Sequence, residues 1–262
     1  MKETLYYSEL SWQDMKEAVG EQRIIILPVG STEQHGPHLP ICTDDFMAQR
    51  WAIDSSTEAR SKYGVKSLVM PGIHYGNAQH HMAFPGTITL SFETLKNLIF
   101  EVGDSVLFHG FRKLVILNVH GGNRYAVRAA AVDLGMKYAR RNPQVYIRVA
   151  EDCDPDLNPL LVDAEVLITY SAEAAQRSMV HAGSLETAKM LHLLPSWVFM
   201  ERAKGINIPF KNSPQEVFPY DALTSSGARG KPGEATAEAG KVMWEALVHH
   251  FADYLYQLSK QA

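Results

Sequence analysis

Short apolar runs alternate with stretches of helical periodicity through the first 150 residues of the chain. The apolar runs predict four strands, at residues 23–29, 67–70, 113–119 and 145–149. Apolar residues that recur every three or four positions predict helices between them, at residues 11–19, 44–62, 95–109 and 124–141. Strands that are apolar throughout are typical of parallel sheets whose two faces are both buried. The pattern therefore predicts an α/β fold, with a mainly parallel sheet and helices on both faces.

The remainder of the chain is less regular. A loop rich in Gly, His and Asn spans residues 72–86, and a loop rich in Pro, Gly and Ser spans residues 207–233. A helical pattern over residues 172–193 is interrupted at residues 181–183. The last helix has an apolar stripe that indicates core packing: Trp244, Val248, Phe251, Leu255 and Leu258. The length of 262 residues fits one domain, residues 1–262, although two small domains would also fit.

The composition is that of an ordinary soluble globular protein, with 46% hydrophobic and 21% charged residues. The formal charge of −4 comes from interspersed acids and bases, which argues against nucleic acid as a partner. No apolar stretch is long enough to span a bilayer, so we expect no membrane partner. The two cysteines, Cys42 and Cys153, fit a reducing compartment, and we expect a cytoplasmic protein.

Three candidate metal ligands follow the first predicted strand. Glu33, His35 and Asp44 supply the carboxylate and imidazole groups that zinc and manganese favour. The loops at the carboxyl ends of parallel strands are also where open α/β sheets build their active sites. Taken singly, each residue has a structural alternative, since Asp44 could cap the next helix, Glu33 could be solvated and His35 could pack in its loop. Together the three favour a metal site.

A second strand end supplies another histidine. His120 follows the predicted strand at residues 113–119 and precedes Gly121, Gly122 and Asn123. Glycines allow a tight strand-to-helix turn and a close approach of the backbone to a bound group. The segment lacks the lysine of a phosphate-binding loop and the spacing of a dinucleotide fingerprint. We therefore interpret His120 as a metal ligand and Asn123 as a helix cap.

Histidines also occur in two other segments. His181 and Glu186 lie on either side of Ser184, which we expect to cap a helix with Glu186 in its first turn. The alternatives are a surface histidine and a glutamate that only complements the helix dipole. His80 and His81 lie in the loop at residues 72–86. Because adjacent side chains do not readily face one site, we expect at most one of these two to be functional.

These segments together resemble the motifs of the creatininase (creatinine amidohydrolase) family. The resemblance covers about residues 20–195 and rests on Glu33-Gln34-His35-Gly36, Asp44, Phe84-Pro85-Gly86-Thr87, His120-Gly121-Gly122-Asn123 and His181-Ala182-Gly183-Ser184-Leu185-Glu186-Thr187. It implies a three-layer αβα sandwich, a site for two divalent metal ions and hydrolysis of an amide-type C–N bond. It also implies a homo-oligomer, commonly a hexamer built from dimers.

Carried over residue by residue, the resemblance implies that Glu33 and His120 bind one metal and that His35 binds the other, with Asp44 bridging both. In creatininase a glutamate two positions after the strand-end histidine completes the second site. This chain has Gly122 at that position.

The resemblance also suggests how the second site is completed. Glu186 is the nearest replacement for the missing glutamate, as a ligand or as a base, and His181 matches a histidine implicated in proton transfer. We therefore expect Glu186 and His181 to be catalytic, with zinc, manganese or both as cofactors and iron as an alternative.

The resemblance departs from creatininase at the substrate. Creatininase closes tryptophans over creatinine, and the corresponding regions here, around Glu151 and Arg177, contain none. We therefore expect an amidohydrolase that acts on another small-molecule amide, formamide or cyclic amide, polar or anionic enough for Arg177 to bind. A deformylase and a peptidase of the same family provide alternatives. A further alternative is a metal-dependent binding protein that has lost catalysis.

Overall fold

The computed structural model describes residues 2–138, 142–151, 181–207 and 219–261. Within them four parallel strands form one sheet in the order β2-β1-β3-β4. The strands are β1 (Ile24–Val29), β2 (Ser67–Val69), β3 (Lys113–Asn118) and β4 (Tyr146–Glu151). The register pairs Val29 with Asn118 and Asn118 with Glu151, so β1, β3 and β4 end at one level. The predicted parallel sheet is confirmed.

Helices lie before the first strand, between the strands and after the last strand. The α-helices are α1 (Trp12–Gly20), α2 (Thr43–Tyr63), α3 (Phe92–Phe108), α4 (Arg124–Tyr138), α6 (Ser184–Leu193), α7 (Met200–Ala203) and α8 (Ala237–Ser259). The 3-10 turns are η1 (Tyr7–Glu9), η2 (Gln79–His81), η3 (Gly121–Asn123), η5 (Pro195–Trp197), η6 (Tyr220–Ala222) and η7 (Pro232–Glu234). Residues 172–180 of the helix expected at 172–193 lie outside the described residues. None of the helices in the described ranges is long and apolar enough to cross a membrane.

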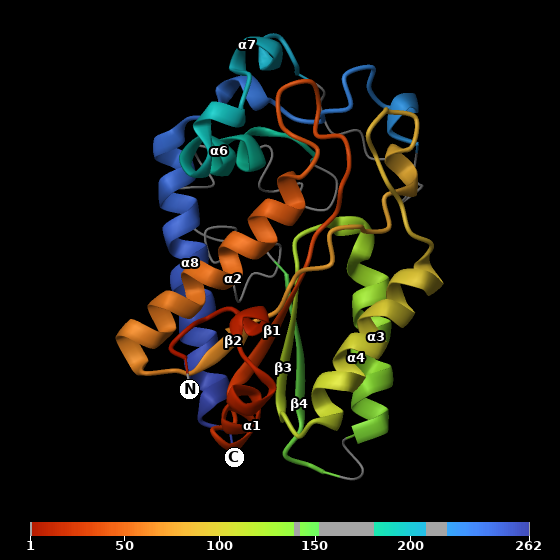
Figure 1. Cartoon of the computed structure of the whole chain (residues 1–262). Helices are drawn as coiled ribbons and strands as arrows, with labels where there is room; N and C mark the ends of the chain where they lie inside the picture. The colour runs from red at the N-terminus through yellow and green to blue at the C-terminus, as the bar shows by residue number, and fades with distance from the viewer. Residues whose placement is uncertain (1, 139–141, 152–180, 208–218, 262) are drawn as a thin grey trace.

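The sheet is buried on both faces, which explains its uninterrupted apolar strands. Ile24 and Ile26 of β1 belong to a core shared with α2 and α8. Ile25 and Leu27 belong to a second core, shared with α3 and α4. The two pairs of helices cover opposite faces of the sheet (Figure 1). This is the three-layer αβα arrangement that the sequence predicted.

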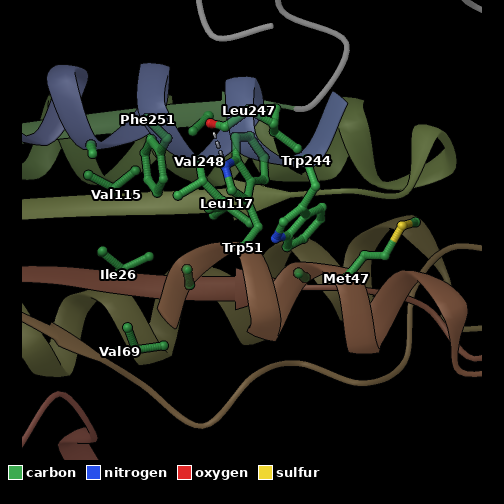
Figure 2. Packing of buried hydrophobic residues seen from close by; sticks show 14 of the residues in the cluster. Ile26, Met47, Trp51, Val69, Val115, Leu117, Trp244, Leu247, Val248 and Phe251 are labelled. Atoms are coloured by element: carbon green, nitrogen blue, oxygen red, sulfur yellow. Dashed lines mark hydrogen bonds between the residues drawn. The ribbon is translucent and has the colours of Figure 1, made fainter. Parts of the chain in front are cut away.

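Trp51 fixes α2 against α8. The Trp51 side chain is fully buried and packs on Phe251, with ring centroids 5.1 Å apart. Its indole Nε1 donates a hydrogen bond of 3.1 Å to the carbonyl of Leu247 in α8 (Figure 2). A buried indole N–H without such a partner would be costly to desolvate. The contact helps to set the position of α2, whose first turn carries Asp44.

The strand order has its switch point between β1 and β3. The chain leaves β1 toward β2 on one side and leaves β3 toward β4 on the other. In open α/β sheets this arrangement opens a crevice beyond the carboxyl ends of the two central strands. The segments after β1 and β3 meet there, since Asn123 Nδ2 donates a hydrogen bond of 2.9 Å to the Gly30 carbonyl. Helix α6 lies beyond the same end of the sheet (Figure 1).

Candidate metal centre

Glu33 lies within a buried polar cluster beyond the end of β1. Its side chain is completely buried, and Oε2 accepts a hydrogen bond of 2.8 Å from the Ser31 hydroxyl. The same oxygen lies 3.1 Å from Nε2 of His120. The other oxygen, Oε1, lies 3.3 Å from Nε2 of His81 and 3.7 Å from Nδ1 of His181. The alternative of a solvated Glu33 is therefore wrong, because three imidazoles surround this carboxylate.

Asp44 joins the two histidines that were predicted as ligands. Its Oδ1 lies 3.2 Å from Nε2 of His35, and its Oδ2 lies 3.2 Å from Nδ1 of His120. Cys42 is the N-cap residue of α2 and no side chain caps this helix, so the capping alternative for Asp44 is wrong. The fold thus brings together Glu33, His35, Asp44 and His120 from two strand ends and one helix start.

Three atoms of this cluster are buried without a hydrogen-bond partner: Glu33 Oε1, His35 Nε2 and Asp44 Oδ2. Buried polar atoms in native proteins are almost always paired, and a bound ion is one explanation for several unpaired ones that converge. One ligand atom from each of these residues lies within 4.8 Å of the other two. A mixed set of carboxylates and imidazole is chemically suited to zinc or manganese. The residues present therefore fit a divalent cation.

The electrostatics of the cluster also favour positive charge. Burial lowers the pKa of His35, but the carboxylates of Asp44, Glu186 and Glu33 outweigh it and raise that pKa to about 10. Burial likewise opposes a charge on His120, while Glu33 and Asp44 raise its pKa well above the ordinary value. The buried carboxylates thus draw protons onto their neighbours, and a divalent cation would compete for the same positions.

His181 and Glu186 form a second group of candidate ligands with His35. One ligand atom from each of the three lies within 4.8 Å of the others. The Glu186 Oε2 lies 4.0 Å from Nε2 of His35 and accepts a hydrogen bond of 2.6 Å from the Ala182 N–H. Glu186 is therefore both part of the cluster and a hydrogen-bond partner for the backbone just before α6.

The start of α6 differs from the prediction in its cap. Gly183 is the N-cap residue and Ser184 is the first helical residue, so the expectation that Ser184 caps this helix is wrong. The Glu186 carboxylate accepts the N–H of Ala182, the residue just before this cap. Ala182 has a φ of 51°, which is uncommon for a residue with a Cβ and indicates local strain.

His181 is buried and faces the cluster, so the alternative of a surface histidine is wrong. Its side chain is 8% exposed, and its Nε2 donates a hydrogen bond of 2.6 Å to the Gln34 carbonyl. Burial, followed by the neighbouring His35, lowers the pKa of His181 well below its ordinary value, although Asp44 opposes this. A neutral His181 with its proton on Nε2 leaves Nδ1 bare and near Glu33, where it is suited to accept a proton.

Comparison with known proteins identifies the family. A family model described as creatininase, creatinine amidohydrolase, matches residues 8–255. The chain belongs to the creatininase family.

Named relatives in the creatininase family are hydrolases. The mycofactocin precursor peptide peptidase of Mycobacterium tuberculosis (strain ATCC 25618 / H37Rv) is 31% identical over 231 residues, which cover 86% of this chain and 81% of that protein. The creatinine amidohydrolase of Pseudomonas putida is 26% identical over 263 residues, which cover 97% and 96%. A crystal structure of creatinine amidohydrolase superposes with a TM-score of 0.84 at 26% identity, over 100% of both chains. This chain is a creatininase-family hydrolase.

Gly122 departs from the creatininase pattern because its surroundings leave no room for a side chain. A Cβ at this position would lie 2.2 Å from the Asn77 carbonyl oxygen, 2.4 Å from Nε2 of His120 and 3.0 Å from Cε1 of His80. A Cβ at the adjacent Gly121 would meet nothing within 4 Å. The loop before α3 thus fills the space that a glutamate would need, and the departure is part of the packing of this creatininase-family chain.

The rings of both His80 and His81 border the cluster, and the expectation that at most one of them is functional stays a prediction. The His80 ring lies 5.7 Å from that of His120, and the His81 ring lies 4.2 Å from that of His181. Both belong to η2, where successive residues are rotated by about 120° rather than the 180° of a strand, so neighbouring rings can border one space.

Tyr220 borders the same cluster and was not predicted. Its ring lies 4.2 Å from that of His81 and 5.1 Å from that of His181. Burial raises the pKa of Tyr220 even though Arg229 opposes it, so the phenol stays protonated. Aromatic residues in the loop expected at residues 207–233 follow no spacing pattern, and the sequence therefore held no signal for Tyr220.

Three further residues have structural roles. Asn123 holds two loops together, because its Nδ2 binds the Gly30 carbonyl and its Oδ1 accepts a hydrogen bond of 2.8 Å from the Asn77 N–H. It directly precedes α4, and its role as the cap of that helix stays a prediction. Glu151 is buried and pairs with Arg128 at 2.6 Å. Burial raises the pKa of the Cys42 thiol, which keeps it protonated and a poor nucleophile. Arg177 and Cys153 lie outside the described residues.

Proposed function

We propose that this chain is a metal-dependent hydrolase of amide-type C–N bonds. The observation that carries the proposal is the buried cluster in which unpaired atoms of Glu33, His35 and Asp44 converge beside His181. The relatives named as a peptidase and an amidohydrolase support this class of bond.

We infer two cation positions that share Asp44. Glu33 and His120 would hold one cation, and His35 and Glu186 would hold the other. Asp44 lies 3.2 Å from both histidines, which suits a bridging carboxylate. When bound, the cations would polarise the substrate carbonyl and lower the pKa of the attacking water. The ligand types favour zinc or manganese, and iron would also fit.

His181 is the proposed proton carrier. Its bare Nδ1 can take a proton from the attacking water and deliver it to the departing nitrogen. We assign Glu186 as a ligand rather than a base, because its Oε2 lies 4.0 Å from Nε2 of His35 and its carboxylate lies within ligand distance of His35 and His181. The rings of His81 and Tyr220 pack beside His181 and help to exclude bulk water from this side.

The substrate class is inferred to be a small amide or a short peptide other than creatinine. The four tryptophans lie in α1, α2, η5 and α8, so none comes from the segment around residue 151 or from residue 177. The relative at 31% identity is a peptidase, which makes a peptide bond the first C–N bond to test. Formamides and lactams are the other candidates, and released formate would identify a deformylase.

The test is hydrolysis of short peptides, formamides and lactams before and after chelation. We expect turnover to disappear on chelation and to return with Zn²⁺ or Mn²⁺. His181→Ala should abolish turnover while the cation content is unchanged. Full activity in the metal-free protein would overturn the proposal, and tight binding without turnover of any substrate would favour the binding protein instead.

We also infer a homo-oligomer, with a hexamer as the specific expectation. Tyr125, Val132 and Met136 of α4 are 67%, 62% and 61% exposed and lie on one stripe of the helix. Exposed apolar patches of this kind are typical of protein contacts. Light scattering that gives the 29.2 kDa of a single chain would contradict this inference. A cytoplasmic location stays a prediction.

A further inference from the structure

Gln34 contacts two histidines of the cluster, one through its side-chain amide and the other through its backbone carbonyl. Its side-chain Nε2 lies 2.8 Å from Nδ1 of His81. Its backbone carbonyl lies 2.6 Å from Nε2 of His181. All three residues are buried, so no bulk water competes for these contacts. One residue between the candidate ligands Glu33 and His35 therefore reaches both rings.

The orientation of the Gln34 amide is fixed by two backbone groups. Its Nε2 donates a hydrogen bond of 3.0 Å to the Gly227 carbonyl, which can only accept. Its Oε1 accepts a hydrogen bond of 2.9 Å from the Gly36 N–H, which can only donate. The amide NH₂ group therefore faces His81, and Nδ1 of His81 must be the acceptor. In a neutral His81 the proton is then on Nε2.

In His181 the proton is also on Nε2, but a backbone carbonyl fixes it there. The nitrogen of His181 that faces Glu33 is the unprotonated Nδ1. The Gln34 carbonyl can only accept, so the proton of His181 is on Nε2 and Nδ1 is bare. The two rings are stacked with centroids 4.2 Å apart. The protonated Nε2 of His81 lies 3.3 Å from Glu33 Oε1, and the bare Nδ1 of His181 lies 3.7 Å from the same oxygen. Glu33 Oε1 thus lies between the Nε2–H group of His81 and the unprotonated Nδ1 of His181.

We propose that Gln34 is a positioning residue that holds His81 as an N–H donor and His181 as a proton acceptor beside Glu33. Glu33, His81 and His181 lie within ligand distance of one another, but a cation needs a bare nitrogen and His81 presents a protonated one. His81 therefore presents an N–H group toward Glu33 and is not a metal ligand, while His181 stays available for proton transfer. The inference rests on the proposed metal centre but not on its catalytic activity.

The first test locates the ring protons directly. The full-length chain, labelled with ¹⁵N-histidine and prepared with and without Zn²⁺, is measured by long-range ¹H–¹⁵N correlation, and His81→Asn and His181→Asn variants assign the signals. We expect an unprotonated Nδ1 in both rings, with the His81 Nδ1 signal shifted by its hydrogen bond and that of His181 sensitive to Zn²⁺. A proton on Nδ1 of His81 would overturn the proposal, as would loss of its Nε2 proton when Zn²⁺ binds.

The second test changes Gln34 itself. Gln34→Met removes the amide, so His81 should become a mixture of both tautomers, whereas His181 should keep its proton on Nε2 because a backbone carbonyl holds it. Gln34→Glu should move the His81 proton to Nδ1 and add one tightly bound equivalent of Zn²⁺ at Glu33, His81 and His181. Gln13→Glu, exposed on α1, controls for the added charge.

The variants separate positioning from general stability. A residue with only a structural role would disturb both rings or neither, and either result for Gln34→Met would overturn the proposal. Should Gln34→Glu fail to fold, the wild-type and Gln34→Met spectra decide the matter. If both rings have the expected tautomers but the protein hydrolyses no amide, the proposed function is overturned and this inference stands.

Discussion

The cluster has two halves that reach the crevice by different routes: a strand-end half, Glu33 and His120, and an α6 half, His181 and Glu186. Glu33 and His120 follow adjacent strands whose paired backbones fix where each strand ends. His181 and Glu186 come from the start of α6, which packs on α8 rather than on the sheet. At Gly240 a Cβ would lie 1.8 Å from the Ala188 carbonyl oxygen, so α6 and α8 are in backbone contact there. The strand-end half is therefore set by sheet register, and the α6 half is set by helix packing.

Asp44 is the residue that unites the two halves, so its removal should have the largest effect. Asp44→Asn should release both cations and lower kcat/KM by about 10³-fold or more, because several kcal/mol of transition-state stabilisation would be lost. Metal content per chain and steady-state kinetics measure this. Asp45→Asn is the matched control, since Asp45 binds His74 at 2.7 Å instead. Retention of both cations by Asp44→Asn would show that the halves are independent.

Glu186→Gln should remove the α6 half alone. We expect one cation per chain in place of two, and a loss of about 10²-fold in kcat/KM, the usual cost of one polarising group. Glu201→Gln, exposed on α7, provides the control. Loss of both cations from the Glu186 variant would mean that the strand-end half cannot bind a cation by itself.

Gly122→Ala tests the packing of the strand-end half. The new Cβ would collide with the Asn77 carbonyl, and we expect a loss of about 1–3 kcal/mol in the free energy of unfolding. Gly121→Ala should change stability little, because its Cβ would meet nothing within 4 Å. Denaturant unfolding of the two variants compares them directly. Equal free energies of unfolding in the two variants would show that the loop before α3 moves aside at little cost in stability.

His38 connects the two halves and should produce the smallest effect. Its Nε2 donates a hydrogen bond of 2.9 Å to the Thr187 hydroxyl, which in turn binds the Gly183 carbonyl at 2.6 Å. Burial, followed by the neighbouring His35, lowers the pKa of His38 from 6.5 to about 4. The unfolded chain therefore binds a proton below pH 6.5 that folded His38 does not, and stability should fall as the pH decreases toward 4.

A melting series over this pH range measures the effect. His38→Gln keeps a donor for Thr187 but does not titrate, so its melting temperature should depend less on pH, by a few degrees. His109→Gln, exposed at the end of α3, should leave the pH dependence unchanged. An identical pH dependence in the wild type and His38→Gln would mean that other groups account for the acid sensitivity.

The sequence predicted the strand-end half better than the α6 half, for physical reasons. Apolar runs reveal parallel strands, and ligands just after them must meet at one edge, which is how Glu33 and His120 could be placed. The cap of α6 was predicted wrongly because the helix begins one residue earlier than expected, with Gly183 as its N-cap and Ser184 already helical. Tyr220 reaches the cluster only through tertiary packing of a loop, and no local pattern reveals such a contact.

The crowding around Gly122 has a consequence for mutational paths. A glutamate introduced there by one substitution would collide with the Asn77 carbonyl unless the loop before α3 moved. The reverse change, from glutamate to glycine, meets no such clash, so the constraint acts in one direction only. The identity of residue 122 and the path of the loop before α3 are therefore epistatic, and we expect a glutamate at this position only in chains whose loop takes another path.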